Sequence, residues 1–267
     1  MRNKKIIKLC TWGNKIFIEK FLNKFIKKKN LELNKNKFAF DFEIFIEKSK
    51  RRTVSLIIKE GRLFFKCPFQ IKDDEINEIL KKKNKWIQKK INFQKNRIKE
   101  LKKKINENII LFKGEEKAVK FIKNEKNKIL LNETEIIIFC NSEKSANLAL
   151  TKWLKIEAHY FIENRVNCLS SKTKIDFDKL EVKELRTKWG ACYFNKRNIV
   201  INWRLIMAPI SVINYVIIHE LCHLIQPDHS KYFWREVRRF KPDYNQDRLW
   251  LKEKGYLVLN LGASERI

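Results

Sequence analysis

The sequence predicts an α+β fold, with an antiparallel, β-rich N-terminal lobe followed by a helical C-terminal lobe that keeps an antiparallel edge strand. Two observations lead to this prediction. Apolar and polar residues alternate over residues 38–46 and 109–140, as they do in half-buried strands, whereas apolar residues recur at helical spacing over residues 76–105 and 144–169. The 267 residues suffice for one large domain or two small ones. We expect three parts, residues 1–37, 38–143 and 144–267.

The N-terminal half is expected to hold an extension, a small sheet and a long basic helix. Residues 1–37 are rich in Lys and Asn but carry a helical pattern, which fits a docking helix or a loosely attached extension. Two short strand-like segments flank Glu60-Gly61 and predict a hairpin. A Lys-rich helix follows, with Asp73 or Asp74 as its N-cap.

The C-terminal half is expected to alternate strands and helices. A strongly apolar helix stands out between two segments that contain proline. Gly255 fits the C-cap of the last helix. The expected elements are strands at residues 180–186 and 199–203, a loop at 187–198, and helices at 210–224, 231–240 and 243–254.

The formal charge of +29 has two interpretations. A strongly basic protein attracts polyanions, because Lys and Arg release counterions from phosphate backbones. The basic residues are, however, mostly Lys mixed with many Ile and Asn, as AT-rich coding sequence produces throughout a proteome. Nucleic acid or a nucleotide is therefore a partner that the composition permits without requiring it.

Cysteine usage and hydropathy predict a cytoplasmic protein without a membrane partner. The six cysteines are scattered and form no Cys-x-x-Cys pair, which favours reduced thiols over a disulfide framework. The N-terminus lacks the apolar stretch of a signal peptide, and no segment approaches the roughly 18 apolar residues of a membrane span.

The apolar helix contains the motif HELCH, from His219 to His223. Two histidines at positions i and i+4 lie one turn apart on the same helix face, so both imidazoles can point at one cation. Glu220 then lies beside the metal without ligating it, where it can take a proton from a bound water. Imidazole ligands and an activated water suit zinc, so the motif predicts one Zn²⁺ ion with Glu220 as general base.

The third ligand has two candidates. His229 comes six residues after His223, where Gln226-Pro227-Asp228 must turn the chain back toward the helix. Glu236 is the alternative, in the manner of zinc sites that use a downstream acid. We favour His229, because the turn itself delivers an imidazole. The spacing equals that of metzincins, but Gln226 replaces their middle glycine and no Met follows His229, so this class is rejected.

The C-terminal motifs resemble those of the YgjP-like family of metal-dependent hydrolases and metallopeptidases. The resemblance covers about residues 47–255 and implies a zincin-like α+β fold, three His ligands, a Glu base and a peptide substrate. Residues 144–267 would then be the catalytic lobe. Its motifs are Thr187-Lys188-Trp189-Gly190-Ala191-Cys192, Asn202-Trp203-Arg204-Leu205, His219 to His223, and Asp228-His229-Ser230 with Phe233-Trp234.

Departures from the family pattern affect the substrate region. Lys188, Ala191 and Asp228 replace the usual Arg, Ser and Asn, while the zinc motif is intact. Arg186 and Arg204 are candidates to bind a substrate carboxylate or phosphate or to stabilise an oxyanion, although both can instead anchor the loop.

Two more residues and two strands complete the candidate substrate region. Trp189 and Asn202 are further candidate substrate contacts, and Trp189 also fits the core. A peptide could add to the strand at 199–203 or at 180–186.

Three other functions remain open at this point. The same metal could serve cleavage of a nucleotide phosphoanhydride. The site arrangement also resembles SprT and WLM proteases, which digest proteins crosslinked to DNA, and the Lys-rich helix around Trp86 and Lys95 could then tether the enzyme to DNA. A binding module with a structural zinc is the non-enzymatic alternative.

Overall fold

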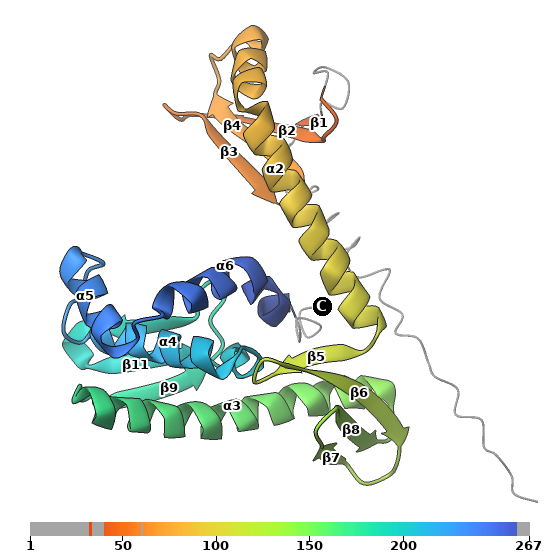
Figure 1. The fold of residues 1–267 in the computed structure, drawn as a ribbon. Coiled ribbons are helices and arrows are strands. Elements are labelled where there is room, and N and C mark those ends of the chain that lie inside the picture. Colours follow the sequence, from red (N-terminus) through yellow and green to blue (C-terminus); the bar gives the residue numbers. More distant parts are fainter. Residues whose placement is uncertain (1–31, 34–39, 60, 261–267) are drawn as a thin grey trace, which may run out of the picture. The chain divides into compact units, whose positions relative to one another are not determined.

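The computed structural model describes residues 32–33, 40–59 and 61–260, and the chain divides into two compact units, residues 1–106 and 107–267 (Figure 1). The described residues form helices and three small mixed sheets, which confirms the α+β class. The predicted extension, residues 1–37, lies outside the described residues, apart from the backbone of the short strand β1 (Glu32–Leu33).

The first unit contains a four-stranded sheet in the order β1-β2-β4-β3. The hairpin predicted at Gly61 is present, because β3 and β4 pair antiparallel and Gly61 takes a φ of +75° in their turn. The lobe is not wholly antiparallel as predicted, since β4 inserts beside β2 in parallel register. The strands are β2 (Ile44–Ser49), β3 (Ser55–Lys59) and β4 (Arg62–Pro68).

The long helix α2 (Asp73–Asn106) covers one face of this sheet with its N-terminal half. Four apolar side chains on one helical face are buried against β2 and β4, and the last of them is Ile91. Gln94 then fastens the helix to the hairpin: its Nε2 donates to the Ile58 carbonyl at 2.8 Å, and its Oε1 accepts from the Gly61 N–H at 3.0 Å. The buried residues are Ile76, Leu80, Ile87 and Ile91.

The second unit contains two sheets that share the long helix α3 (Glu143–Thr173). The first sheet has the order β5-β6-β8-β7 and the second the order β10-β11-β9. The strands are β5 (Ile109–Phe112), β6 (Glu115–Lys123), β7 (Lys128–Leu131), β8 (Glu135–Cys140), β9 (Lys179–Lys183), β10 (Gly190–Tyr193) and β11 (Asn198–Asn202).

The boundary expected at residue 143 is wrong, because strands β5 to β8 pack with the C-terminal unit. The Lys113 N–H donates to the Ile206 carbonyl at 2.7 Å, and Phe112 stacks on Trp153 of α3 with ring centroids 5.2 Å apart. Gly114, at φ +90°, lies so close to Pro209 that an added Cβ would meet its Cα at 2.7 Å. These contacts make the four strands part of the second unit.

Helix α4 (Ile210–Cys222) is the centre of the second unit. It contacts α3, α5, α6, β10 and β11, and Figure 1 shows it between α6 and the strands of the second sheet. A helix that is apolar all round is expected to be buried, and most of its residues are. Its neighbours are a 3₁₀ segment (Trp203–Met207), α5 (Lys231–Phe240) and α6 (Tyr244–Asn260).

Two local predictions in this unit are wrong. The expected loop at 187–198 contains strand β10, which pairs with β11 from Gly190↔Ile201 to Tyr193↔Asn198. Gly255 does not cap the last helix, because α6 continues through it to Asn260. The absence of a side chain at Gly255 leaves room for the Trp189 ring, since an added Cβ would lie 2.8 Å from it.

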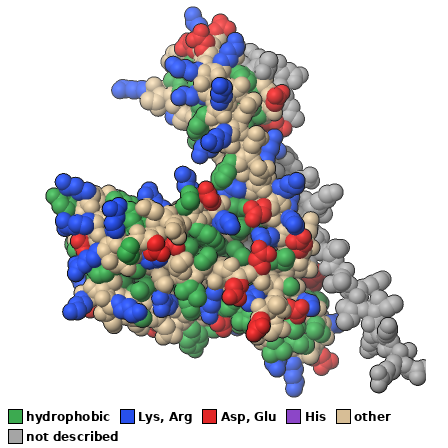
Figure 2. Space-filling model, viewed as in Figure 1, with side chains coloured by type: hydrophobic (Ala, Val, Ile, Leu, Met, Phe, Trp, Pro, Cys, Tyr) green, Lys and Arg blue, Asp and Glu red, His purple; other side chains and the backbone are tan. Residues whose placement is uncertain are grey.

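The basic charge is divided unevenly between the two units. Residues 1–106 contain 32 of the 60 Lys and Arg but only 11 of the 31 Asp and Glu, so their formal charge is +21 and that of the rest of the chain is +8. Figure 2 shows many Lys and Arg side chains on the surface around α2. In the part of the chain that the structure describes, no helix has the length and hydropathy that crossing a membrane requires.

Candidate metal centre

The last turn of α4 places His219 and His223 side by side. α4 ends at Cys222, but His223 keeps helical angles (φ −66°, ψ −17°) and its N–H donates to the His219 carbonyl at 3.2 Å. The two side chains therefore keep the i, i+4 relation that the motif predicts, and their ring centroids are 4.8 Å apart.

A tight turn after α4 brings His229 back to this pair. The Leu224, Ile225 and Gln226 N–H groups donate to carbonyls of the last helical turn. Asp228 Oδ1 then accepts from the Ser230 N–H at 3.1 Å and from Gln226 Nε2 at 2.9 Å, which fixes the start of α5. As a result, His229 Nε2 lies 3.1 Å from His219 Nε2.

The three histidines form a group with the geometry of a metal site. Their candidate ligand nitrogens all lie within 4.8 Å of one another. For comparison, two nitrogens that bind one tetrahedral zinc at about 2.0–2.1 Å are about 3.3 Å apart. His223 Nδ1 lies 3.1 Å from the Gln226 carbonyl, which can only accept, so this nitrogen carries the hydrogen and Nε2 stays available as a ligand. The donor set fits zinc.

Glu236, the alternative third ligand, lies outside this group. Its carboxylate oxygens are 3.5 Å from Arg235 Nε and 3.5 Å from Arg239 Nη1. Among the described residues, the candidate metal group contains the three histidines alone. The structure thus brings His229, and not Glu236, next to the other two histidines.

Burial favours the neutral form of His219 and His223, which metal coordination requires. Burial, reinforced by His223, His229 and Arg248, lowers the pKa of His219 to about 3. Burial also lowers the pKa of His223. Two thiols lie nearby, but burial raises the pKa of Cys192 to about 11 and that of Cys222 to about 12, so neither offers a thiolate at neutral pH.

Phe233 of α5 packs against all three histidine rings. It is fully buried, stacks on His223 with centroids 4.4 Å apart, and meets His219 and His229 edge-on at 4.8 and 4.9 Å. Trp234 adds a second ring, 5.9 Å from both His219 and His229. The aromatic wall restricts the orientations of the imidazoles before any ion binds.

Glu220 is buried beside the histidines, with 6% of its surface exposed. Burial raises its pKa to about 8, and the nearby Lys188 opposes this shift. The carboxylate packs directly against the backbone of β10: a Cβ added to Gly190 would lie 2.6 Å from Glu220 Oε1. Gly190 is therefore required for space, and it couples the edge strand β10 to Glu220.

Gly190→Ala is expected to displace this carboxylate and to lower any hydrolytic rate that depends on Glu220 by about 100-fold, because misplacement by about 1 Å has effects of this size. Zinc content should stay at the wild-type value, since neither Gly190 nor Glu220 belongs to the metal group. The measurements are steady-state turnover and metal analysis. Ala191→Ser is the control, because its side chain points to the opposite face of the strand, and equal loss in both variants would contradict the steric explanation.

The candidate substrate residues differ in how they are placed. Asn202 is fully buried: its Nδ2 donates to the Leu185 and Lys188 carbonyls at 2.9 and 3.0 Å, and its Oδ1 accepts from the Arg204 N–H at 3.1 Å. Arg204 is 5% exposed and pairs with Glu184 at 3.3 Å. This placement gives Asn202 and Arg204 structural roles and leaves little surface for substrate contact.

Trp189 and Arg186 lie nearer the surface. Trp189 is half-buried and its ring packs on Gly255, so it belongs at least in part to the core. Arg186 is exposed, and contact with a substrate stays a prediction for it. Sequence reasoning missed Gly190, Lys188 and Phe233 as parts of this centre, although all three stand within the motifs that carry the family resemblance.

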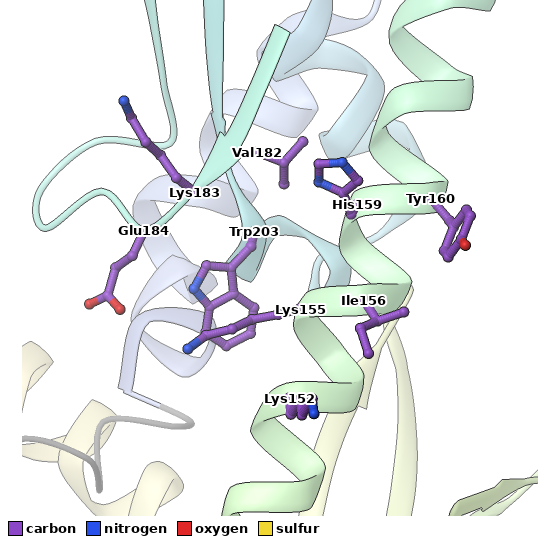
Figure 3. A pocket seen from close by; sticks show the side chains of 9 residues that line it. All are labelled: Lys152, Lys155, Ile156, His159, Tyr160, Val182, Lys183, Glu184 and Trp203. Atoms are coloured by element: carbon purple, nitrogen blue, oxygen red, sulfur yellow. The ribbon is translucent and has the colours of Figure 1, made fainter.

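A cavity of about 680 Å³ lies at the other edge of the second sheet, between α3 and β9 (Figure 3). His159, the one histidine of the chain outside the cluster, lines this cavity, and the three clustered histidines do not. Trp203 forms one wall, with Lys155 Nζ 5.6 Å from its ring. The cavity is thus separate from the candidate metal centre.

The comparison with solved structures finds two metallopeptidase zymogens, each matched over about a third of this chain. Jannalysin of Methanocaldococcus jannaschii is 22% identical, with 35% of this chain and 95% of that chain covered and a TM-score of 0.32. Abylysin of Pyrococcus abyssi is 21% identical, with 34% and 93% covered and a TM-score of 0.30. Among curated proteins, none matches the sequence.

The family comparison covers both units. Residues 52–254, about three quarters of the chain, match the YgjP-like, metallopeptidase domain. The match contains the three clustered histidines, Glu220 and the Gly190 strand. This protein belongs to the YgjP-like metallopeptidase family.

Proposed function

We propose that the protein is a zinc-dependent peptidase whose His219, His223 and His229 hold one zinc ion. The single observation that supports this most is the convergence of three imidazoles, whose candidate ligand nitrogens lie within 4.8 Å of one another. Zinc bound there would supply Lewis acidity, lowering the pKa of a water molecule toward about 7 and polarising a substrate carbonyl. A structural zinc site has four protein ligands, whereas this group, among the described residues, has three.

Glu220 is proposed as the general base. It follows His219 directly, is held in place by Gly190, and has a pKa raised by burial to about 8, near the pH at which a base works best. In this role the carboxylate accepts a proton from the attacking water and transfers it to the leaving nitrogen of the peptide bond. The apolar surroundings exclude competing water from the carboxylate.

The substrate is proposed to lie along β10. Of the two strands expected to bind a peptide, residues 199–203 correspond to β11, which is central and buried, and residues 180–186 to β9 at the far edge of the sheet. β10 is an edge strand and begins at Gly190, which contacts Glu220. An extended peptide paired with β10 would therefore pass the proposed base.

The test is cleavage of a peptide library by the purified full-length protein, analysed by mass spectrometry, together with its metal content. We expect about one zinc per chain, cleavage that stops on chelation, and recovery when zinc is returned. A panel of nucleoside triphosphates assayed in parallel separates peptidase from phosphoanhydride hydrolase. Zinc-dependent phosphate release without peptide cleavage would reject the peptide substrate, and absence of bound zinc would reject the metal site.

A further inference from the structure

A row of basic and aromatic side chains follows the solvent face of α2. Lys82, Trp86, Lys89, Lys90 and Phe93 stand at positions i, i+4, i+7, i+8 and i+11, which places them on one side of the helix, away from the four buried apolar residues. We call these five residues the α2 row. All five are exposed, Trp86 by 44% and Phe93 by 40%. The guanidinium carbon of Arg97 lies 5.2 Å from the Phe93 ring and extends the row.

The charge of this helix segment is costly for the helix itself. Residues 81–104 contain twelve Lys and Arg and one acidic residue, Glu100. Like charges at i, i+4 repel and destabilise a helix. Four such lysine pairs occur here, at 81/85, 85/89, 95/99 and 99/103. A bound polyanion would remove this repulsion.

Biased composition does not account for the location of these cations. A codon bias acts on the whole chain, yet residues 1–106 have a formal charge of +21 and residues 107–267 only +8. The same bias does not explain two large aromatic rings that face solvent between lysines. The α2 row therefore differs from the rest of the chain both in its amount of positive charge and in the two exposed rings that stand between its lysines.

We propose that the α2 row binds single-stranded nucleic acid. The lysine side chains would contact backbone phosphates, while Trp86 and Phe93 would stack on bases. The two rings are seven residues apart, about 10 Å along the helix axis, so both can serve one strand. The exposed rings favour unpaired bases over duplex DNA, whose bases are already stacked, and over acidic peptides or lipid headgroups, which offer no ring faces. The proposal is independent of the metal centre.

The test is fluorescence anisotropy of a labelled single-stranded DNA 30-mer of mixed sequence, titrated with the full-length protein at several salt concentrations. Lys82→Gln/Lys89→Gln/Lys90→Gln should weaken binding at least about 10-fold and reduce the slope of log K against log salt by about 2, since each lost contact contributes roughly 0.7. Trp86→Ala/Phe93→Ala should weaken binding by at least about 10-fold while leaving the slope unchanged.

Two controls make the result specific. Lys123→Gln/Lys126→Gln/Lys128→Gln removes the same charge from exposed positions in the second unit and should change affinity less than twofold. The Glu220→Gln protein should bind like the wild type, which separates this proposal from the peptidase. Circular dichroism confirms that each variant is folded.

Three outcomes would overturn the proposal. If the two lysine triples weaken binding equally, the attraction comes from net charge and has no site on α2. Duplex DNA, heparin or phosphatidylserine vesicles that bind as tightly as the single strand, with no effect of the aromatic changes, would exclude base stacking. Absence of binding at low salt would exclude the site altogether.

Discussion

Glu220→Gln is expected to retain zinc and to lose at least about 1,000-fold in peptide turnover. A general base contributes about 10²- to 10⁴-fold, and glutamine cannot accept the proton. The amide has the same shape as the carboxylate, so its packing against Gly190 is preserved. Zinc stays because Glu220 does not belong to the group of candidate ligands. The measurements are kcat on a cleaved peptide and the zinc content of the same sample.

Glu236→Gln is the matched control for this change. Glu236 lies on the neighbouring helix α5 and pairs with arginines outside the histidine group. Its removal should alter kcat by less than about threefold and leave zinc bound. Turnover that survives in Glu220→Gln would reject the proposed base. Zinc lost from Glu236→Gln would instead make Glu236 a ligand.

Asn202→Ala is expected to lower the free energy of unfolding by about 2–4 kcal/mol. The change removes the partners of the Leu185 and Lys188 carbonyls and of the Arg204 N–H, and each buried group left unpaired costs about 1–3 kcal/mol unless water reaches it. The measurement is urea unfolding of the full chain followed by far-ultraviolet circular dichroism. The loop that contains Lys188 and Trp189 should also become accessible to protease at lower urea concentration.

Asn198→Ala provides the comparison on the same strand. Asn198 begins β11, and its Nδ2 donates a single hydrogen bond, to Oε1 of the half-buried Glu181 at 2.9 Å. Glu181 also pairs with the exposed Lys183. Its loss should cost under about 1 kcal/mol. If Asn198→Ala and Asn202→Ala lowered the free energy of unfolding equally, the three hydrogen bonds of Asn202 would have no special importance for stability.

The convergence of the three histidines could be predicted from sequence because its determinants are local. The i, i+4 spacing of His219 and His223 and the turn that delivers His229 are both visible in eleven consecutive residues. α5 was also predicted at its observed limits, since its amphipathic pattern begins after Ser230 and ends before Pro242. Where the residues that determine a structural feature lie within the same short segment as the feature, the sequence is enough to predict it.

The errors concern features whose cause lies elsewhere in the chain. β10 was expected to be a loop, because Gly190 is a poor strand former and its strand state depends on pairing with β11 and on space for Glu220. Gly255 was expected to cap the last helix. It is instead a glycine because the Trp189 ring packs where a Cβ would lie, and Trp189 is too distant in sequence for a local pattern to show this. Asn202 was expected at the substrate, and only the fold shows that its side chain is enclosed by the loop at 185–189.

The contact between Trp189 and Gly255 gives the far end of the chain an influence on the proposed base. Trp189 precedes Gly190, the residue against which the Glu220 carboxylate rests. A side chain at position 255, or loss of the second half of α6, would push or release the indole and shift the first residue of β10 with it. Sequence variation more than thirty residues beyond Glu220 can thus tune the carboxylate without touching any histidine.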